Sequence, residues 1–117
     1  MLERKFAEQF AAEWIAAWNS HELPRILSHY SEDFEMSSPV IAQIAGEPSG
    51  RLKGKSAVGA YWAQALQRMP QLHFDLHSVL VGADSLTLYY KGHRGMSAEV
   101  LFFDTEGKVF RAAAHYA

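Results

Sequence analysis

The sequence predicts an α+β domain in which three helices pack on one face of a strongly curved antiparallel sheet. Apolar residues recur at the helical spacing of three or four in three segments before Pro70, but alternate at the strand spacing of two from Leu72 onward. The predicted order of elements is α-α-β-α-β-β-β-β. A curved sheet closed by helices tends to form a cone with a pocket inside, so we expect a cone-shaped domain with an internal cavity.

The N-terminal segment predicts two helices that form a hairpin. Four aromatic residues recur every four positions on the first helix: Phe6, Phe10, Trp14 and Trp18. Asn19 tolerates left-handed backbone and is expected to end this helix, and Pro24 suits the first turn of the next one. The second helix carries its own apolar stripe: Leu23, Ile26, Leu27 and Tyr30.

A short strand and a third helix follow the hairpin. Phe34, Met36 and Ser38 alternate with polar residues and predict a strand that ends at Pro39. Residues 41–54 contain three glycines and a proline, which indicates a loop with at most a little strand. The third helix should begin near Lys55 or Ser56 and end before Pro70; its expected inner face has four members: Val58, Trp62, Leu66 and Met69.

The C-terminal part predicts four antiparallel strands joined by tight turns. The turns are expected at residues 81–85, 92–95 and 104–108, each of which contains glycine. Alternation predicts the residues that point inward: Leu72, Phe74, Leu76, Leu80, Leu86, Leu88, Tyr90, Glu99, Leu101 and Phe103.

Length and charge narrow the functional classes. The 117 residues suit one domain, residues 1–117, and the net charge of -2 provides no basic surface for nucleic acid. Cysteine is absent, which excludes thiolate chemistry and is compatible with the cytoplasm. Charged residues from Glu3 to Glu8 interrupt the N-terminal apolar run, so we expect a soluble protein with neither signal peptide nor membrane span.

Three runs resemble the SnoaL-like branch of the nuclear transport factor 2-like superfamily. They are AAWNSHELPRILSHYSEDFEMSSP, LKGKSAVGAYW and LFFDTEGKVFRAAAHY, and together with their connections they span nearly the whole chain. The resemblance implies the cone-shaped fold described above. It does not choose an activity, because this superfamily contains isomerases, cyclases, epoxide hydrolases, dehydratases and non-catalytic binding modules.

The ketosteroid isomerase branch of this superfamily offers the most concrete comparison, since it resembles Trp14–Pro39 without a gap. The resemblance places that branch's hydrogen-bonding tyrosine at Trp14, its general-base aspartate at Ser38 and its protonated aspartate at Glu99. Only Glu99 keeps its chemical type. A serine hydroxyl cannot remove a carbon-bound proton unaided, so isomerisation of steroids by that mechanism is not expected.

Glu99 and Ser38 are the candidate catalytic residues. If Glu99 points inward, burial among aromatic side chains would raise its pKa and make it a neutral acid or weak base. The alternative is that Ala98, Val100 and Phe102 form the inner set and that Glu99 is solvated. Ser38 could exchange hydrogen bonds with a ligand, or could simply be a turn residue before Pro39.

The candidate ligand-binding residues lie on faces that are expected to converge: Trp14, Trp18, Tyr30, Met36, Tyr61, Trp62, Phe74, Leu88 and Leu101. They suit an apolar or aromatic small molecule, with isomerase, cyclase or dehydratase chemistry at Glu99. Alternatively, the same aromatic residues fill the core of a non-catalytic dimeric module.

No cofactor or metal site is expected. His73 and His77 have a helical metal-site spacing, but in a strand their Cα atoms would be ~13 Å apart, too far to share one ion easily. The strand alternation places His115 on the outside, away from Glu99. An aspartate-arginine-aspartate set of the epoxide-hydrolase kind cannot be assembled from the available aspartates.

The outer face of the sheet predicts a homodimer. With Glu99 inward, the opposite face would present four apolar residues: Val79, Tyr89, Val100 and Phe102. Burying that face against a second copy would remove on the order of 800 Å² per partner, a standard interface size. Alternatively, the loop from Ile41 to Leu52 covers this face and the protein is a monomer.

Overall fold

The computed structural model describes residues 1–117 and contains four helices and one six-stranded sheet. In chain order the elements are α1 (Arg4–Ser20), α2 (Leu23–Leu27), β1 (Tyr30–Ser37), α3 (Pro39–Ile44), β2 (Arg51–Lys53), α4 (Lys55–Arg68), β3 (Asp75–Val81), β4 (Ser85–Gly92), β5 (Gly95–Phe103) and β6 (Val109–Tyr116). The predicted α+β class is confirmed. Two short elements, α3 and β2, replace most of the expected loop.

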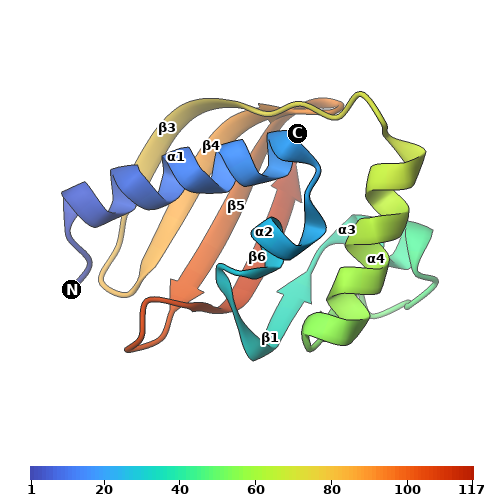
Figure 1. The fold of residues 1–117 in the computed structure, drawn as a ribbon, viewed down its shortest axis with the longest axis horizontal. Coiled ribbons are helices and arrows are strands. Elements are labelled where there is room, and N and C mark those ends of the chain that lie inside the picture. Colours follow the sequence, from blue (N-terminus) through green and yellow to red (C-terminus); the bar gives the residue numbers. More distant parts are fainter.

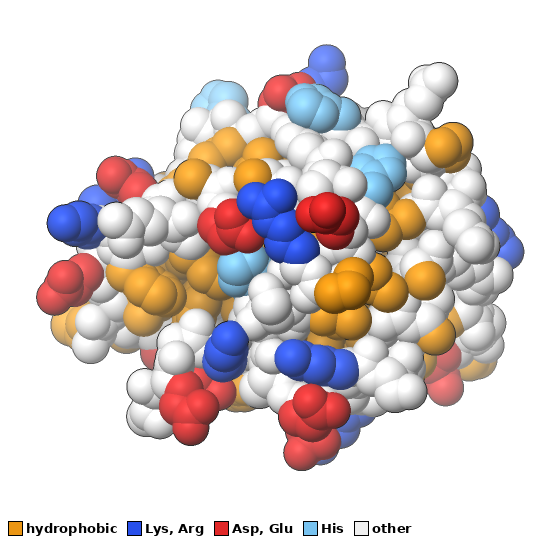
Figure 2. Space-filling view, in the orientation of Figure 1, with side chains coloured by type: hydrophobic (Ala, Val, Ile, Leu, Met, Phe, Trp, Pro, Cys, Tyr) orange, Lys and Arg blue, Asp and Glu red, His pale blue; other side chains and the backbone are white.

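The curved sheet and the helices form two layers (Figure 1). Helix α1 lies across the sheet and contacts β3, while α4 packs on β1 and α2. On the face that Figure 2 shows, acidic and basic side chains are interspersed, in keeping with the Arg4–Glu8 and Arg25–Glu13 ion pairs of α1 and α2. None of the helices is long and apolar enough to cross a membrane.

Helix α1 buries the predicted aromatic face but ends later than expected. Its last turn is closed by His21, which adopts left-handed backbone with φ 60° and donates its N–H to the carbonyl of Trp18. Asn19 stays helical because its side chain pairs with the backbone of Phe74: Nδ2 donates to the carbonyl at 3.0 Å and Oδ1 accepts from the N–H at 2.7 Å. The prediction that Asn19 ends the helix is therefore wrong.

The second helix is shorter than its apolar pattern predicts. It spans only Leu23–Leu27, and Tyr30 begins β1 instead of completing the helical stripe. Backbone pairing outweighs the helical spacing here, because Tyr30 lies opposite Val109 of β6 and the Val109 N–H donates to the carbonyl of His29 at 3.0 Å.

Helix α3 forms because Ser38 and Pro39 together begin a helix. Ser38 is extended, its Oγ accepts from the N–H of Val40 at 3.1 Å, and Pro39 occupies the first helical position. The Ser-Pro pair therefore starts a six-residue helix at the point where a loop is predicted. Six residues are too few for a reliable helical period, which explains why the sequence pattern does not indicate it.

The strands follow the spatial order β2-β1-β6-β5-β4-β3. All neighbouring pairs are antiparallel except β1 and β6, which are parallel. The expectation of a wholly antiparallel sheet is thus corrected at one pair. The parallel pairing joins the first long strand of the chain to the last.

An irregularity in β3 reverses the predicted alternation in the second half of that strand. Leu76 lies opposite Tyr90 and Ser78 lies opposite Tyr89, so β3 has one extra residue at this point. After this bulge Val79 faces the core at 8% exposure, whereas Leu80 faces outward at 59% exposure. The predictions that Leu80 points inward and Val79 outward are both wrong.

Candidate functional site

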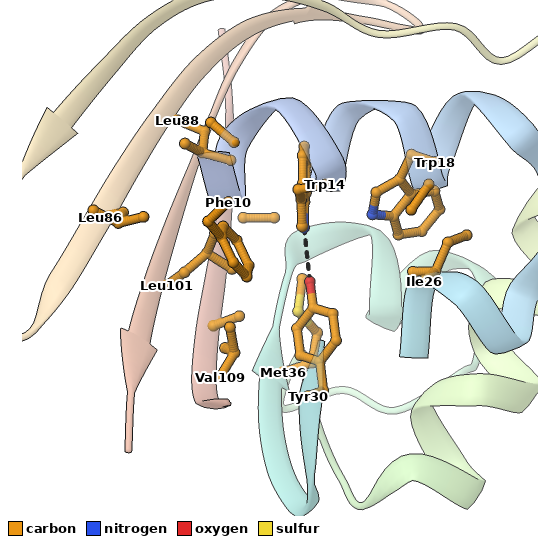
Figure 3. Packing of buried hydrophobic residues seen from close by; sticks show 14 of the residues in the cluster. Phe10, Trp14, Trp18, Ile26, Tyr30, Met36, Leu86, Leu88, Leu101 and Val109 are labelled. Carbon is orange, nitrogen blue, oxygen red and sulfur yellow. Dashed lines mark hydrogen bonds between the residues drawn. The ribbon is translucent and has the colours of Figure 1, made fainter. Parts of the chain in front are cut away.

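A cavity of about 570 Å³ opens at one end of the molecule. Its wall combines the C-terminal halves of α1 and α4 with α3, the segment after α4, and the ends of β4, β5 and β6 that meet there. The opposite end of the core is filled by aliphatic side chains around Phe10, as Figure 3 shows for Leu86, Leu101 and Val109. The cavity therefore lies at the end of the core that is built from aromatic rings instead of aliphatic side chains.

Seven of the predicted site residues line this cavity: Trp14, Trp18, Met36, Tyr61, Trp62, Phe74 and Glu99. The other predicted ligand contacts, Tyr30, Leu88 and Leu101, are at most 1% exposed and belong to the core instead of the cavity wall. Direct contact of these three with a ligand stays a prediction. Inward alternation identifies a buried side chain, but it cannot say whether the neighbouring space is filled or open.

The aromatic wall is rigidly packed. Trp14 stacks on Phe74 with ring centroids 5.7 Å apart and meets Tyr90 edge-on at 5.3 Å. The Trp14 Nε1 donates a hydrogen bond to the Tyr30 hydroxyl at 2.9 Å, a contact that Figure 3 marks. Tyr30 thus supports the wall from behind. Trp14 is committed to this hydrogen bond and presents its ring, not its N–H, to the cavity.

Glu99 points inward from β5 and is the only carboxyl side chain of the cavity wall. It is 4% exposed, and Tyr90 of β4 donates its hydroxyl to Oε1 at 3.2 Å. Burial raises the pKa of Glu99 to about 7, while the hydrogen bond from Tyr90 acts in the opposite direction. Near neutral pH the carboxyl is therefore present in both its protonated and its ionised form.

Tyr90 lines the cavity and bonds Glu99, but the predicted site omits it. Burial, followed by the negative charge of Glu99, raises the pKa of Tyr90 far above its ordinary value, so the phenol remains a donor at neutral pH. The alternation on β4 could have found it, because Tyr90 follows Leu88 on the inner face and Leu88 lies directly opposite Glu99. Tyr90 is thus the diagonal neighbour of Glu99 across the strand pair.

Ser38 lies behind the cavity wall. Its Oγ caps α3, and the Tyr116 hydroxyl is 3.5 Å away. It is 4% exposed and borders a smaller hollow between α3 and the segment Pro48–Arg51. Ser38 thus begins the turn at Pro39 and is not among the residues that line the main cavity, and a hydrogen bond from it to a ligand stays a prediction.

Several other wall residues were missed because they come from segments without a clear pattern. Helix α3, the turn after β4 and the C-terminal end of β6 contribute Pro39, Val40, Gln43, Ile44, His93, Arg94 and Tyr116, and α4 ends with Arg68 at the same cavity. His115 is exposed on the outer side, as predicted, and does not line the cavity. No three His, Asp or Glu side chains are grouped as a metal site would require.

Trp18 carries the one buried side-chain polar atom that lacks a hydrogen-bond partner, its Nε1. The ring packs edge-on against Trp62, with centroids 5.1 Å apart and an interplanar angle of 76°. A buried indole N–H without an acceptor is costly. All three tryptophans of the chain line the cavity, so their fluorescence reports on its contents.

Comparisons with known proteins agree on one family. Residues 11–117 match the model of the SnoaL-like domain. A SnoaL-like protein of unknown function from Burkholderia thailandensis E264 is 54% identical, with 98% of this chain and 97% of that one covered and a TM-score of 0.95. No curated protein sequence matches the chain.

Two more distant structures share the fold alone. SalBIII, an epoxide hydrolase/cyclase-like enzyme of pyran ring formation in the polyether salinomycin, is 14% identical, with coverage of 100% of this chain and 95% of that one and a TM-score of 0.78. TerC, co-crystallised with polyporic acid, is 12% identical, with coverage of 96% and 92% and a TM-score of 0.75.

Proposed function

Because the chain belongs to the SnoaL-like domain family, we propose that it binds an apolar or aromatic small molecule in the cavity and transfers a proton with Glu99. The observation that carries this proposal is a single, fully buried carboxyl in the wall of an aromatic cavity, with a phenol as its hydrogen-bond partner. Reactions of the isomerase, cyclase and dehydratase types depend on such a proton transfer.

The cavity supports the ligand class. Its volume of about 570 Å³ lies in the range of small-molecule sites, and 15 of its 23 lining residues are hydrophobic. The indole faces of Trp14 and Trp62 and the ring of Phe74 form flat apolar walls, which favour a ring system over a flexible polar chain. A ligand of this kind would exclude water from Glu99.

Glu99 supports the reaction class because its pKa matches neutral pH. A general acid or base acts best when its pKa lies near the working pH, and burial raises the pKa of Glu99 to about 7. Tyr90 holds the carboxylate through its hydroxyl and remains protonated. Glu99 is the only carboxyl side chain of the wall, so we assign both receipt and return of the proton to it, as a reaction that shifts one proton requires.

A chemical probe tests proton transfer without knowledge of the natural substrate. In 5-nitrobenzisoxazole, a carboxylate removes the ring C–H proton, the nitrogen–oxygen bond breaks, and a coloured nitrile-bearing phenolate forms. We expect catalysis whose rate rises with pH around a midpoint of about 7. Glu99→Gln should lower kcat/KM at least about a hundredfold, while quenching of tryptophan fluorescence by the probe shows that binding persists.

Two further variants sharpen this test. Tyr90→Phe keeps the carboxyl but removes the hydrogen bond that favours its ionised form, so the midpoint of the rate profile should move to higher pH. Glu106→Gln changes an exposed carboxyl in the β5–β6 turn and should leave the profile unaltered. Equal rates for the Glu99→Gln variant and the wild type would contradict the proposed role of Glu99.

The outer face of the sheet supports a proposed homodimer. Tyr89 is 39% exposed and Phe110 is 41% exposed on this face, and Phe102 lies between Phe110 and the guanidinium of Arg111, which is 4.2 Å above its ring. Val100 lies at the centre of the sheet, opposite Thr87 and Ala113. Val79 is no longer part of this surface. The segment 41–52 begins within α3, which packs on α4 and β2, and Tyr89 and Phe110 remain uncovered.

A further inference from the structure

The six arginines of the chain have different surroundings, and two of them stand apart. Arg4, Arg25 and Arg51 each pair with a glutamate, and Arg111 lies over the ring of Phe102. The remaining two, Arg68 and Arg94, form no ion pair, and both line the cavity.

These two arginines reach the cavity from different elements. Arg68 is the last residue of α4, and Arg94 lies in the turn between β4 and β5 next to His93, which also lines the cavity. Burial raises the pKa of Tyr116, and the positive charge of Arg94 acts in the opposite direction, which places Arg94 close to that phenol at the C-terminal end of β6. The exposed side chains of Arg68 and Arg94 therefore belong to the mouth of the cavity.

The charges of the cavity wall are unbalanced. Its only acidic side chain is Glu99, which is buried and engaged by Tyr90, so no carboxylate side chain of the wall pairs with either arginine. No carboxylate side chain therefore competes with the anion of a ligand for these two arginines. Guanidinium groups suit this role because their planar set of donors matches a carboxylate or phosphate.

We propose that the ligand of this cavity is an aromatic or fused-ring compound with one anionic substituent, whose rings lie between the tryptophan walls and whose anion binds Arg68 and Arg94 at the mouth. This inference rests on the proposed function and adds an orientation to it. The anion stays at the solvent side, and the opposite end of the ring system faces Glu99. An anion in the reverse orientation would meet the carboxyl of Glu99 in a buried site, which is costly.

A matched pair of probes tests the charge. Sodium 2-naphthoate and naphthalene-2-carboxamide have the same ring system and nearly the same shape, but only the first is an anion. Calorimetric titration at about pH 6 keeps the naphthoate ionised and Glu99 mostly protonated. We expect the naphthoate to bind about tenfold more tightly, and this preference to shrink as NaCl is added because salt screens exposed charges.

Arginine variants then locate the anion. Arg68→Gln and Arg94→Gln should each weaken naphthoate binding about threefold, and the double variant should bind both probes equally. Arg111→Gln, on the outer face of the sheet, is the matched control and should bind as the wild type does. Carboxamide affinity should be unchanged in all of these variants, since the removed charges do not contact a neutral substituent.

The outcomes separate this inference from the proposed function. If the two probes bind equally well to the wild type, or if the preference for naphthoate survives in the double variant, the anionic ligand is refuted while the aromatic pocket stands. If neither probe binds, the aromatic pocket fails and the inference fails with it. A preference that disappears only in the Arg68 and Arg94 variants supports both.

Discussion

Replacing Glu99 with glutamine should stabilise the protein, although it removes the proposed catalytic group. In the unfolded chain the carboxyl titrates near its ordinary pKa of 4.5, whereas in the fold burial raises its pKa to about 7. The folded state therefore prefers the protonated form. The wild type has its full stability below about pH 4.5 and loses stability as the pH rises through about 7, because ionisation then occurs inside the fold.

The size of this loss follows from the two pKa values. At about 1.4 kcal/mol per pH unit, a rise from 4.5 to about 7 corresponds to about 3 kcal/mol of stability that is present in acid and absent in base. Glutamine has the same shape and cannot ionise, and its side-chain carbonyl can still accept from the Tyr90 hydroxyl. The free energy of unfolding of Glu99→Gln should therefore exceed that of the wild type by about 3 kcal/mol at about pH 8.5 and by almost nothing at about pH 4.

Urea unfolding at a fixed protein concentration measures this difference directly. Both proteins should be unfolded at several values between about pH 4 and about pH 8.5, with the midpoints and slopes fitted separately. Heating gives a second readout, in which a gain of 3 kcal/mol corresponds to an increase in Tm of roughly 10 °C for a domain of this size. The exposed Glu106→Gln variant controls for the loss of one acidic side chain.

A difference in stability that does not depend on pH would contradict the expected titration of Glu99 inside the fold. If the wild type and Glu99→Gln keep the same separation in unfolding free energy at about pH 4 and about pH 8.5, the carboxyl does not titrate differently in the folded and unfolded states. A loss of stability in Glu99→Gln at high pH would be a stronger contradiction. It would mean that the ionised carboxyl is stabilised in the fold by partners other than Tyr90.

Three other perturbations follow from the structure. Asn19→Ala should cost about 2 kcal/mol in urea unfolding, because two hydrogen bonds to the backbone of Phe74 are lost; a change below about 0.5 kcal/mol would contradict this. The hydrogen bond from Arg25 lowers the pKa of Glu13 to about 2, so the advantage of the wild type over Glu13→Gln, under about 1 kcal/mol for this partly exposed pair, should persist above pH 5 and vanish toward pH 2. Phe102→Asp should yield monomers or insoluble protein, whereas the wild type should scatter light as a dimer of the 13.1 kDa chain; a monomeric wild type would refute the proposed interface.

The residue pattern alone is enough to predict the class of the fold and most of the residues of its inner layer. Apolar residues recur about every four positions in a helix and every two positions in a strand, and both spacings are local properties. The pattern therefore placed α1, α4 and the four C-terminal strands near their observed positions. The same alternation put Leu88 and Tyr90 on the inner face, but it left two orientations open for Glu99, which the structure places inward. These predictions succeed because each depends only on a few neighbouring residues. In each helix or strand, the apolar face is the one that becomes buried.

The position of the open part of the core depends on how the helices pack on the sheet, which the residue pattern does not reveal. Leu88 and Glu99 are direct neighbours on the inner face, yet one belongs to filled core and the other to the cavity wall, because helix placement rather than strand alternation sets the space above each. The bulge in β3, the parallel pairing of β1 with β6 and the cap at Ser38 are also long-range or single-residue events. No period in the sequence encodes them, since each depends on contacts with residues far along the chain or on one local hydrogen bond.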